Sequence, residues 1–198
     1  TSHVRIGTAV LLAALRPAAL VAEEVAVIDQ LSNGRLELGI GAGYSVPEYE
    51  LYNTDITKRY GLTDAAVAEI RRLLDDGIVT PPAAQNPFPI WLGYQGPQGA
   101  KRAGRLGVGL LSLDRALLEP YCEGLVEGGH DPAVARTGGM LDIIVADDPE
   151  TAFERILPHY AHQLNSYRAA AAAGSGRDAA WFASLGFDVV AVEPSVAM

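Results

Sequence analysis

The residues best suited to bind a ligand lie in two glycine-rich stretches. In the first, residues 32–44 (SNGRLELGIGAGY), Gly39, Gly41 and Gly43 take every second position where a short apolar strand ends. Glycines placed in this way leave bare backbone, which a flat or anionic ligand could approach to van der Waals distance. A tight turn that binds nothing explains them equally well. A dinucleotide-binding turn fits less well, because four residues, 45–48, separate the glycines from the next helix.

The second stretch, residues 93–99 (GYQGPQG), leads from a predicted strand at 89–92 into a predicted helix over about residues 98–106. Backbone N–H groups at such a turn and the dipole of the helix both favour an anion. A loop that only begins a helix is the alternative. The residues of this candidate anion site are Gly93, Tyr94, Gln95 and Gly96.

Strands and helices that alternate along the chain must position these two turns. Residues 4–12 are almost wholly apolar, as expected of a parallel strand covered on both faces. Apolar residues at helical spacing follow from Pro17, and a strand at 35–40 completes a βαβ unit. Beyond it we predict a helix capped by Thr63 and Asp64, and the later elements are a strand at 107–113, a helix at 115–127, a strand at 140–146 and a helix that begins at Asp148-Pro149.

Two runs of sequence resemble the bacterial-luciferase-like flavin-dependent oxidoreductases, the luciferase-like monooxygenase family. They are GTAVLLAALRPAALVAEEVAVIDQLSNGRLELGIGAGYSVPEYE and PFPIWLGYQGPQGAKRAGRLGVGLL, and the likeness continues to about residue 168. It implies an α/β fold, a TIM-type (β/α) barrel in which the strand at 4–12 is the third. A full barrel takes about 250 residues, so we expect a partial barrel that lacks its first two strands.

The resemblance also implies an enzyme that uses a flavin, either FMN or a deazaflavin coenzyme, for hydride or oxygen transfer. It places Thr8, Ala9 and Val10 against the flavin ring, and Gly41, Gly43 and Tyr44 beside them. Gly93 to Gly96, with Tyr94 and Gln95 between them, would receive the phosphate. No side chain stands out as an acid or base, so the catalytic residues and the substrate stay unknown. The alternative is a non-catalytic flavin-binding or structural remnant.

The end of the chain has a different character. After an alanine run at 169–173, residues 174–198 resemble the opening of an S-adenosylmethionine-dependent methyltransferase, with a glycine loop and Glu193 at the end of a predicted strand. We therefore divide the chain into a barrel domain, residues 1–168, and a junction and αβ tail, residues 169–198. Because the sequence continues for only five residues after Glu193, we do not expect a working methyltransferase site. The tail could equally be the last helix and strand of the barrel.

Composition limits the partners. The net charge is −9, without a basic patch, which argues against a nucleic-acid or anionic membrane surface and favours a small-molecule substrate. A single cysteine, Cys122, and the absence of a long apolar run or signal-peptide pattern favour the cytoplasm. His159 and His162 lack further ligands for zinc, so no metal is expected. A barrel without two strands would expose unpaired edges, which predicts a homo-oligomer or a partner subunit.

Overall fold

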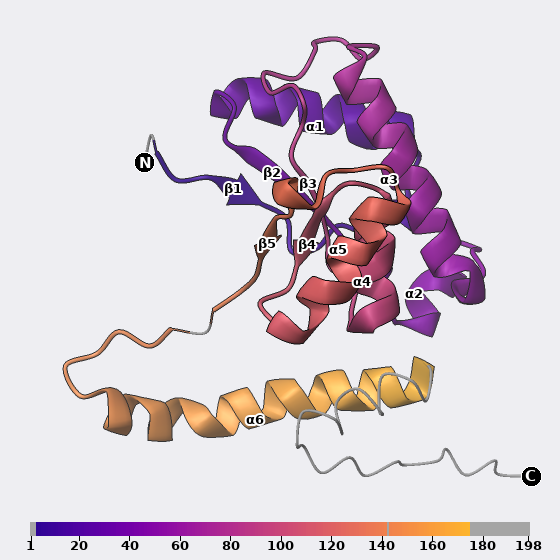
Figure 1. Ribbon diagram of the computed structural model, residues 1–198. Helices are drawn as coiled ribbons and strands as arrows, with labels where there is room; N and C mark the ends of the chain where they lie inside the picture. The colour runs from indigo at the N-terminus through magenta and orange to yellow at the C-terminus, as the bar shows by residue number, and fades with distance from the viewer. Residues whose placement is uncertain (1–2, 142, 175–198) are drawn as a thin grey trace, which may run out of the picture. The chain divides into compact units, whose positions relative to one another are not determined.

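The computed structural model describes residues 3–141 and 143–174 of the 198. Five parallel strands form one sheet whose spatial order follows the chain (Figure 1). The strands are β1 (Ile6–Gly7), β2 (Leu36–Ile40), β3 (Ile90–Leu92), β4 (Gly109–Leu111) and β5 (Thr137–Gly138). The α-helices are α1 (Ala18–Ser32), α2 (Val46–Leu51), α3 (Arg59–Asp75), α4 (Gly96–Arg105), α5 (Leu118–Glu127) and α6 (Pro149–Gly174). Short 3-10 helices are η1 (Ala13–Leu15), η2 (Ile56–Lys58), η3 (Arg115–Leu117) and η4 (Pro132–Val134). The predicted α/β fold, a partial TIM-type barrel, is confirmed.

The chain divides into two compact units. The first, residues 1–43 and 57–140, holds the sheet with α1, α3, α4 and α5, and the second, residues 44–56 and 141–198, holds α2 and α6. No described helix is both long enough and apolar enough to cross a membrane.

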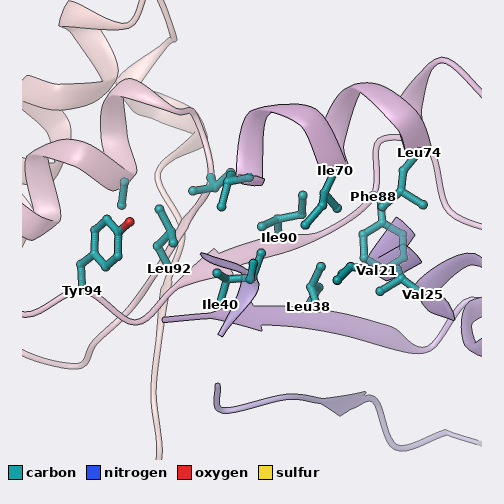
Figure 2. Close-up of a cluster of buried hydrophobic side chains, with 14 of the residues drawn as sticks. Val21, Val25, Leu38, Ile40, Ile70, Leu74, Phe88, Ile90, Leu92 and Tyr94 are labelled. Atoms are coloured by element: carbon teal, nitrogen blue, oxygen red, sulfur yellow. The ribbon is translucent and has the colours of Figure 1, made fainter. Parts of the chain in front are cut away.

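The strands of the first unit turn alternate side chains to opposite faces of the sheet. On β2, Leu36, Leu38 and Ile40 are buried on the face that carries the helices, while Glu37 and Gly39 face the other way. Leu38, Ile40, Ile90 and Leu92 form the core with residues of α1 and α3, as Figure 2 shows. The core residues contributed by these two helices include Val21, Val25, Ile70 and Leu74.

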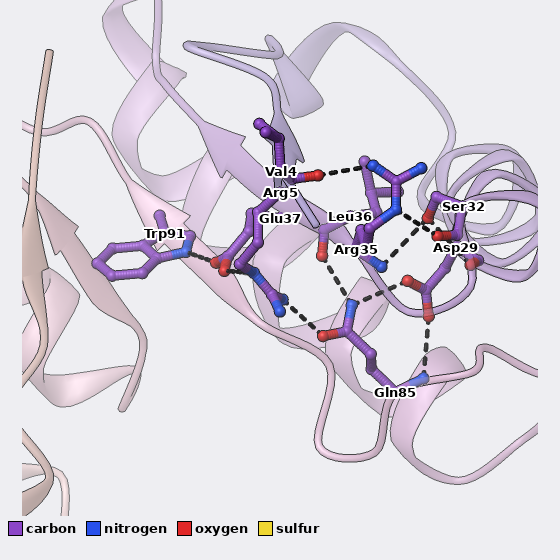
Figure 3. Close-up of polar contacts among 9 residues, drawn as sticks. All are labelled: Val4, Arg5, Asp29, Ser32, Arg35, Leu36, Glu37, Gln85 and Trp91. Carbon is purple, nitrogen blue, oxygen red and sulfur yellow. Dashed lines mark hydrogen bonds and ion pairs between the residues drawn. The ribbon is translucent and has the colours of Figure 1, made fainter. Parts of the chain in front are cut away.

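A buried carboxylate ties the segment before β3 to α1. Asp29 is fully buried and accepts hydrogen bonds from the backbone N–H of Gln85 at 2.9 Å and from its side-chain amide at 2.8 Å (Figure 3). The same amide group donates to the Leu36 carbonyl at 2.8 Å. A buried carboxyl group is tolerated only when its oxygens are hydrogen-bonded, and these bonds hold Gln85 against α1 and the start of β2.

Glycines bring α4 and α5 into close contact. A Cβ on Gly104 would collide with the Tyr121 carbonyl, and one on Gly124 with the Lys101 carbonyl. At the other side of α4, Arg71 on α3 donates to the carbonyl of Leu106 and, at 2.7 Å, to that of Gly107. The carboxyl end of α4 is therefore held from both of its neighbours.

Three sequence predictions about the elements were wrong. Among the described residues, the stretch 4–12 pairs at Ile6–Gly7 and through a single bridge from Leu11 to Ile40. Residues 4–10 are exposed, because β1 has one neighbour, β2, among the described strands. Apolar residues at 140–146 form no described strand, since the pairing with β4 occurs earlier, at Thr137–Gly138. Thr63 and Asp64 do not cap α3, which begins at Arg59, directly after η2.

The predicted start of α6 is confirmed in the second unit. Asp148 precedes the helix and accepts hydrogen bonds from the Thr151 backbone N–H at 3.2 Å and from its hydroxyl at 2.6 Å. The Thr151 hydroxyl and then its backbone N–H lower the pKa of Asp148. Residues 175–198, with Glu193 and the predicted methyltransferase-like loop, lie outside the described residues.

Candidate functional site

The segment from Thr8 to Val10 continues along the edge of β2, and its Thr8 carbonyl and Val10 side chain lie over the inner face of the sheet, the face that is turned away from the helices. The Thr8 hydroxyl donates to the Gly39 carbonyl at 2.7 Å, and Leu11 N–H donates to the same carbonyl at 2.8 Å. The peptide bond between Ala9 and Val10 is cis. Thr8, Ala9 and Val10, which are predicted to contact the flavin ring, are all exposed. A ligand can therefore reach this segment.

The glycines beneath this segment are needed to make room for it. A Cβ on Gly39 would overlap the Thr8 carbonyl, and one on Gly41 would overlap a methyl group of Val10. At Gly93, on the neighbouring strand end, a Cβ would lie 2.9 Å from the other Val10 methyl group. Val10 therefore fills the space on the side of Gly41 and Gly93 where a side chain would project. The predicted ligand contacts of these two glycines stay predictions. The sequence predicts that Val10, Gly43 and Gly93 surround a common pocket at the carboxyl ends of the strands. Val10 and Gly93 do lie side by side, while a pocket that includes Gly43 stays a prediction.

Gly43 and Tyr44 end the first glycine-rich stretch. Gly43 has a φ of +68°, a left-handed conformation that favours glycine. Tyr44 belongs to the second unit, where its ring lies edge-on to that of Tyr167 at 6.2 Å between centroids. Partial burial, and then the neighbouring Tyr167 and Glu48, raise the pKa of Tyr44. Its predicted contact with a ring stays a prediction.

The second turn runs from β3 directly into α4. The helix begins at Gly96, two residues earlier than predicted, so the loop is reduced to Gly93, Tyr94 and Gln95. Gln95 is the N-cap residue but its side chain makes no capping hydrogen bond. Gly96 has a φ of +72°, and a Cβ there would meet nothing within 4 Å. The first amide groups of α4 thus have no side-chain cap, beside open space, and such groups are suited to bind an anion.

Tyr94 does not turn its side chain toward this open space. Only 1% of the residue is exposed, and its hydroxyl donates to Asp64 Oδ1 at 2.8 Å. Burial, followed by the Asp64 carboxylate, raises the pKa of Tyr94 strongly, so the phenol stays protonated. If Tyr94 takes part in binding an anion at this turn, it does so through its backbone.

A polar cluster that the sequence did not lead us to expect lies on the inner face of the sheet, nearer the strand starts. Glu37 accepts hydrogen bonds from Arg5 and from the Trp91 indole (Figure 3). The guanidinium of Arg136 lies 5.0 Å from the centroid of the Trp91 ring. The alternation of Glu37 with the apolar residues of β2 was the available signal, since it places a carboxylate on the face opposite the core.

Among the described residues no group of three or more His, Cys, Asp or Glu is placed to hold a metal ion. His159 and His162 are exposed on α6. Cys122 is a partly buried free thiol. The described site consists of the exposed segment from Thr8 to Val10 and the start of α4, which has no side-chain cap. No described side chain in it is placed to act as an acid or a base.

Comparison with known proteins assigns the chain to a family. The family model for luciferase-like monooxygenases matches residues 1–186, which includes the first part of the tail. An F420-dependent glucose-6-phosphate dehydrogenase of Beutenbergia cavernae is 30% identical over 174 residues, covering 77% of this chain and 52% of the relative. The chain spans about half the length of the curated relatives it matches.

Solved structures support the same assignment of the fold. Monooxygenase RslO1 from Streptomyces bottropensis superposes with a TM-score of 0.74 at 20% identity, over 91% of this chain and 62% of that one. The FMN complex of the oxygenating constituent of 3,6-diketocamphane monooxygenase, a type II Baeyer–Villiger monooxygenase from the CAM plasmid of Pseudomonas putida, gives a TM-score of 0.65 at 16% identity, over 96% and 63%. Because the family model covers nearly the whole sequence, this chain belongs to the luciferase-like monooxygenase family.

Proposed function

We propose that this chain is part of an oxidoreductase that binds a phosphorylated flavin-type coenzyme, either FMN or a deazaflavin such as F420. The observation that carries the proposal is the turn between β3 and α4, where a helix without a side-chain cap begins beside open space at a strand end. The family relation adds support, since the relatives include F420-dependent dehydrogenases and an FMN-bound monooxygenase.

Each part of the site has a separate task in this proposal. The coenzyme, when bound, supplies the hydride or oxygen transfer. Thr8, Ala9 and Val10 present an exposed surface against which its ring can lie. The first backbone N–H groups of α4 hold the phosphate, helped by the positive end of the helix dipole. The chain's own contribution is therefore placement.

Titration of the purified chain with FMN, F420 and riboflavin, followed by fluorescence, tests the proposal. The phosphorylated coenzyme is expected to bind clearly more tightly than the form without phosphate, riboflavin for FMN or the deazaflavin riboside for F420. Gly96→Asp should abolish that preference, because it adds a negative charge at the helix start. Gly77→Asp is the matched control, since Gly77 also has a positive φ, +65°, and open space around it.

Equal affinity with and without the phosphate would reject the phosphate site at α4. Preference for FMN over F420, or the reverse, decides between the two coenzymes. An absorbance spectrum of the purified protein with bands of bound flavin would support the same conclusion independently.

A further inference from the structure

We infer that Asp64 on α3 is a positioning residue for the phosphate-binding turn, acting through Tyr94 and Arg102. The inference rests on the proposed function, because it concerns the same turn between β3 and α4. One carboxylate contacts both sides of that turn. Its Oδ1 accepts the Tyr94 hydroxyl at 2.8 Å, and its Oδ2 pairs with the guanidinium of Arg102 in α4.

Tyr94 is linked mechanically to the first turn of α4. The ideal position of a Cβ on Gly99 lies only 2.7 Å from Tyr94 Cβ, so the helix rests directly on the tyrosine. The Tyr94 ring is fixed in turn by Tyr60, whose ring lies edge-on at 5.3 Å between centroids. A shift of the Tyr94 side chain would therefore shift the backbone at the start of α4.

The hydroxyl of Tyr94 fixes the orientation of the Tyr94 side chain. A buried phenol without a partner loses the free energy of its hydrogen bond, so Tyr94 is held in the orientation that reaches Asp64. The charge of Asp64 is balanced by Arg102, and the carboxylate consequently adds little net repulsion to an anion bound at α4. Arg102 also lies 5.7 Å from the centroid of the Tyr60 ring, which completes the group.

Backbone donors hold a phosphate well only when they stay within a fraction of an ångström of the productive geometry. Loss of the contacts of Asp64 with Tyr94 and Arg102 should therefore reduce the part of the affinity that the phosphate supplies. The contacts between the ring and Thr8 to Val10 should not change. This separates a positioning role from a purely structural one, because general loss of folding would weaken both parts of the affinity.

The test compares the ratio of dissociation constants for riboflavin and FMN, or for the deazaflavin riboside and F420, in matched variants. Tyr94→Phe removes only the hydroxyl and is expected to lower the ratio by about tenfold, with little change in the affinity for the form without phosphate. Asp64→Asn keeps an acceptor for the hydroxyl and should retain more of the ratio than Tyr94→Phe.

Arg71→Gln is the control, because Arg71 holds the opposite end of α4 through the Leu106 and Gly107 carbonyls. It is expected to lower the melting temperature and leave the ratio unchanged. Arg102→Gln provides a second variant with a partly exposed side chain, in case Tyr94→Phe fails to fold, and it should lower the ratio by about threefold.

The possible failures are distinguishable. If the wild-type chain shows no preference for the phosphorylated form, the proposed function fails. If the wild type shows the preference and Tyr94→Phe or, where that does not fold, Arg102→Gln shows it undiminished, the positioning role of Asp64 is overturned. A fall in the ratio in Arg71→Gln equal to that in Tyr94→Phe would also overturn it, since any loosening of α4 would then suffice.

Discussion

Val10 occupies the space that a side chain at Gly41 would need, with its Cβ 3.2 Å from the ideal Cβ position of that glycine. The glycine at the end of β2 is therefore required by the chain's own packing. A ligand that reaches this face meets Val10, which is 39% exposed, before it meets the glycine backbone.

Gly41→Ala should lower the free energy of unfolding by about 1–3 kcal/mol, because the new methyl group overpacks against Val10. Val10→Ala in the same chain removes the colliding methyl groups. The double variant should consequently be more stable than the sum of the two single effects predicts, as urea denaturation would measure. Additive effects would show that Val10 does not fill this space.

Gly124→Ala should lower the free energy of unfolding by about 1–3 kcal/mol, since the Cβ would collide with the Lys101 backbone and force α5 away from α4. Gly61→Ala is the matched control. Gly61 also lies inside a helix, but a Cβ there meets nothing within 4 Å, so the exchange should raise stability by about 0.5–1 kcal/mol. Thermal melts followed by circular dichroism would compare the two, and equal changes would contradict the packing.

The cap at Asp148 predicts a pH dependence for the start of α6. Its pKa is lowered in the folded chain, so the cap stabilises the helix fully above the unfolded value, about 3.9, and this contribution is lost as the pH falls through the folded value. Thr151→Val removes the hydroxyl donor and should raise the pKa of Asp148, measured by NMR titration of the carboxyl carbon. An unchanged pKa would show that the hydroxyl does not stabilise the charge.

The edge strands predict self-association. β1 and β5 each have a partner on one side only among the described strands, and such edges pair with other chains. Size-exclusion chromatography with light scattering should show oligomers, and Ile6→Lys on β1 should reduce them. Ile78→Lys, an exchange at a comparably exposed residue outside the strands, should have no effect. A stable monomer in the wild type would contradict the prediction.

Local pattern was enough to predict the alternation of strands and helices up to α5, while the family followed from the resemblance of two longer runs of sequence. The alternation of strands with helices, the two glycine-rich turns and the cap at Asp148 depend on residues close together in the sequence, where periodicity and turn chemistry are informative. The same reasoning brings the carboxyl ends of parallel strands together, and Val10 and Gly93 do lie side by side, whereas the predicted pocket that includes Gly43 stays a prediction.

Tertiary structure alone decided what those residues contact. Thr63 and Asp64 are residue types typical of a helix cap, yet Asp64 lies inside α3. It accepts a hydrogen bond from the Tyr94 hydroxyl, because this buried phenol, 30 residues away in the sequence, needs an acceptor. Gly41 lies in a pattern typical of a site that a ligand approaches, yet Val10, from the segment after β1, occupies the space where a side chain of Gly41 would project. Sequence spacing describes neighbours along one element, whereas burial and hydrogen bonding between elements depend on which of them pack together in three dimensions.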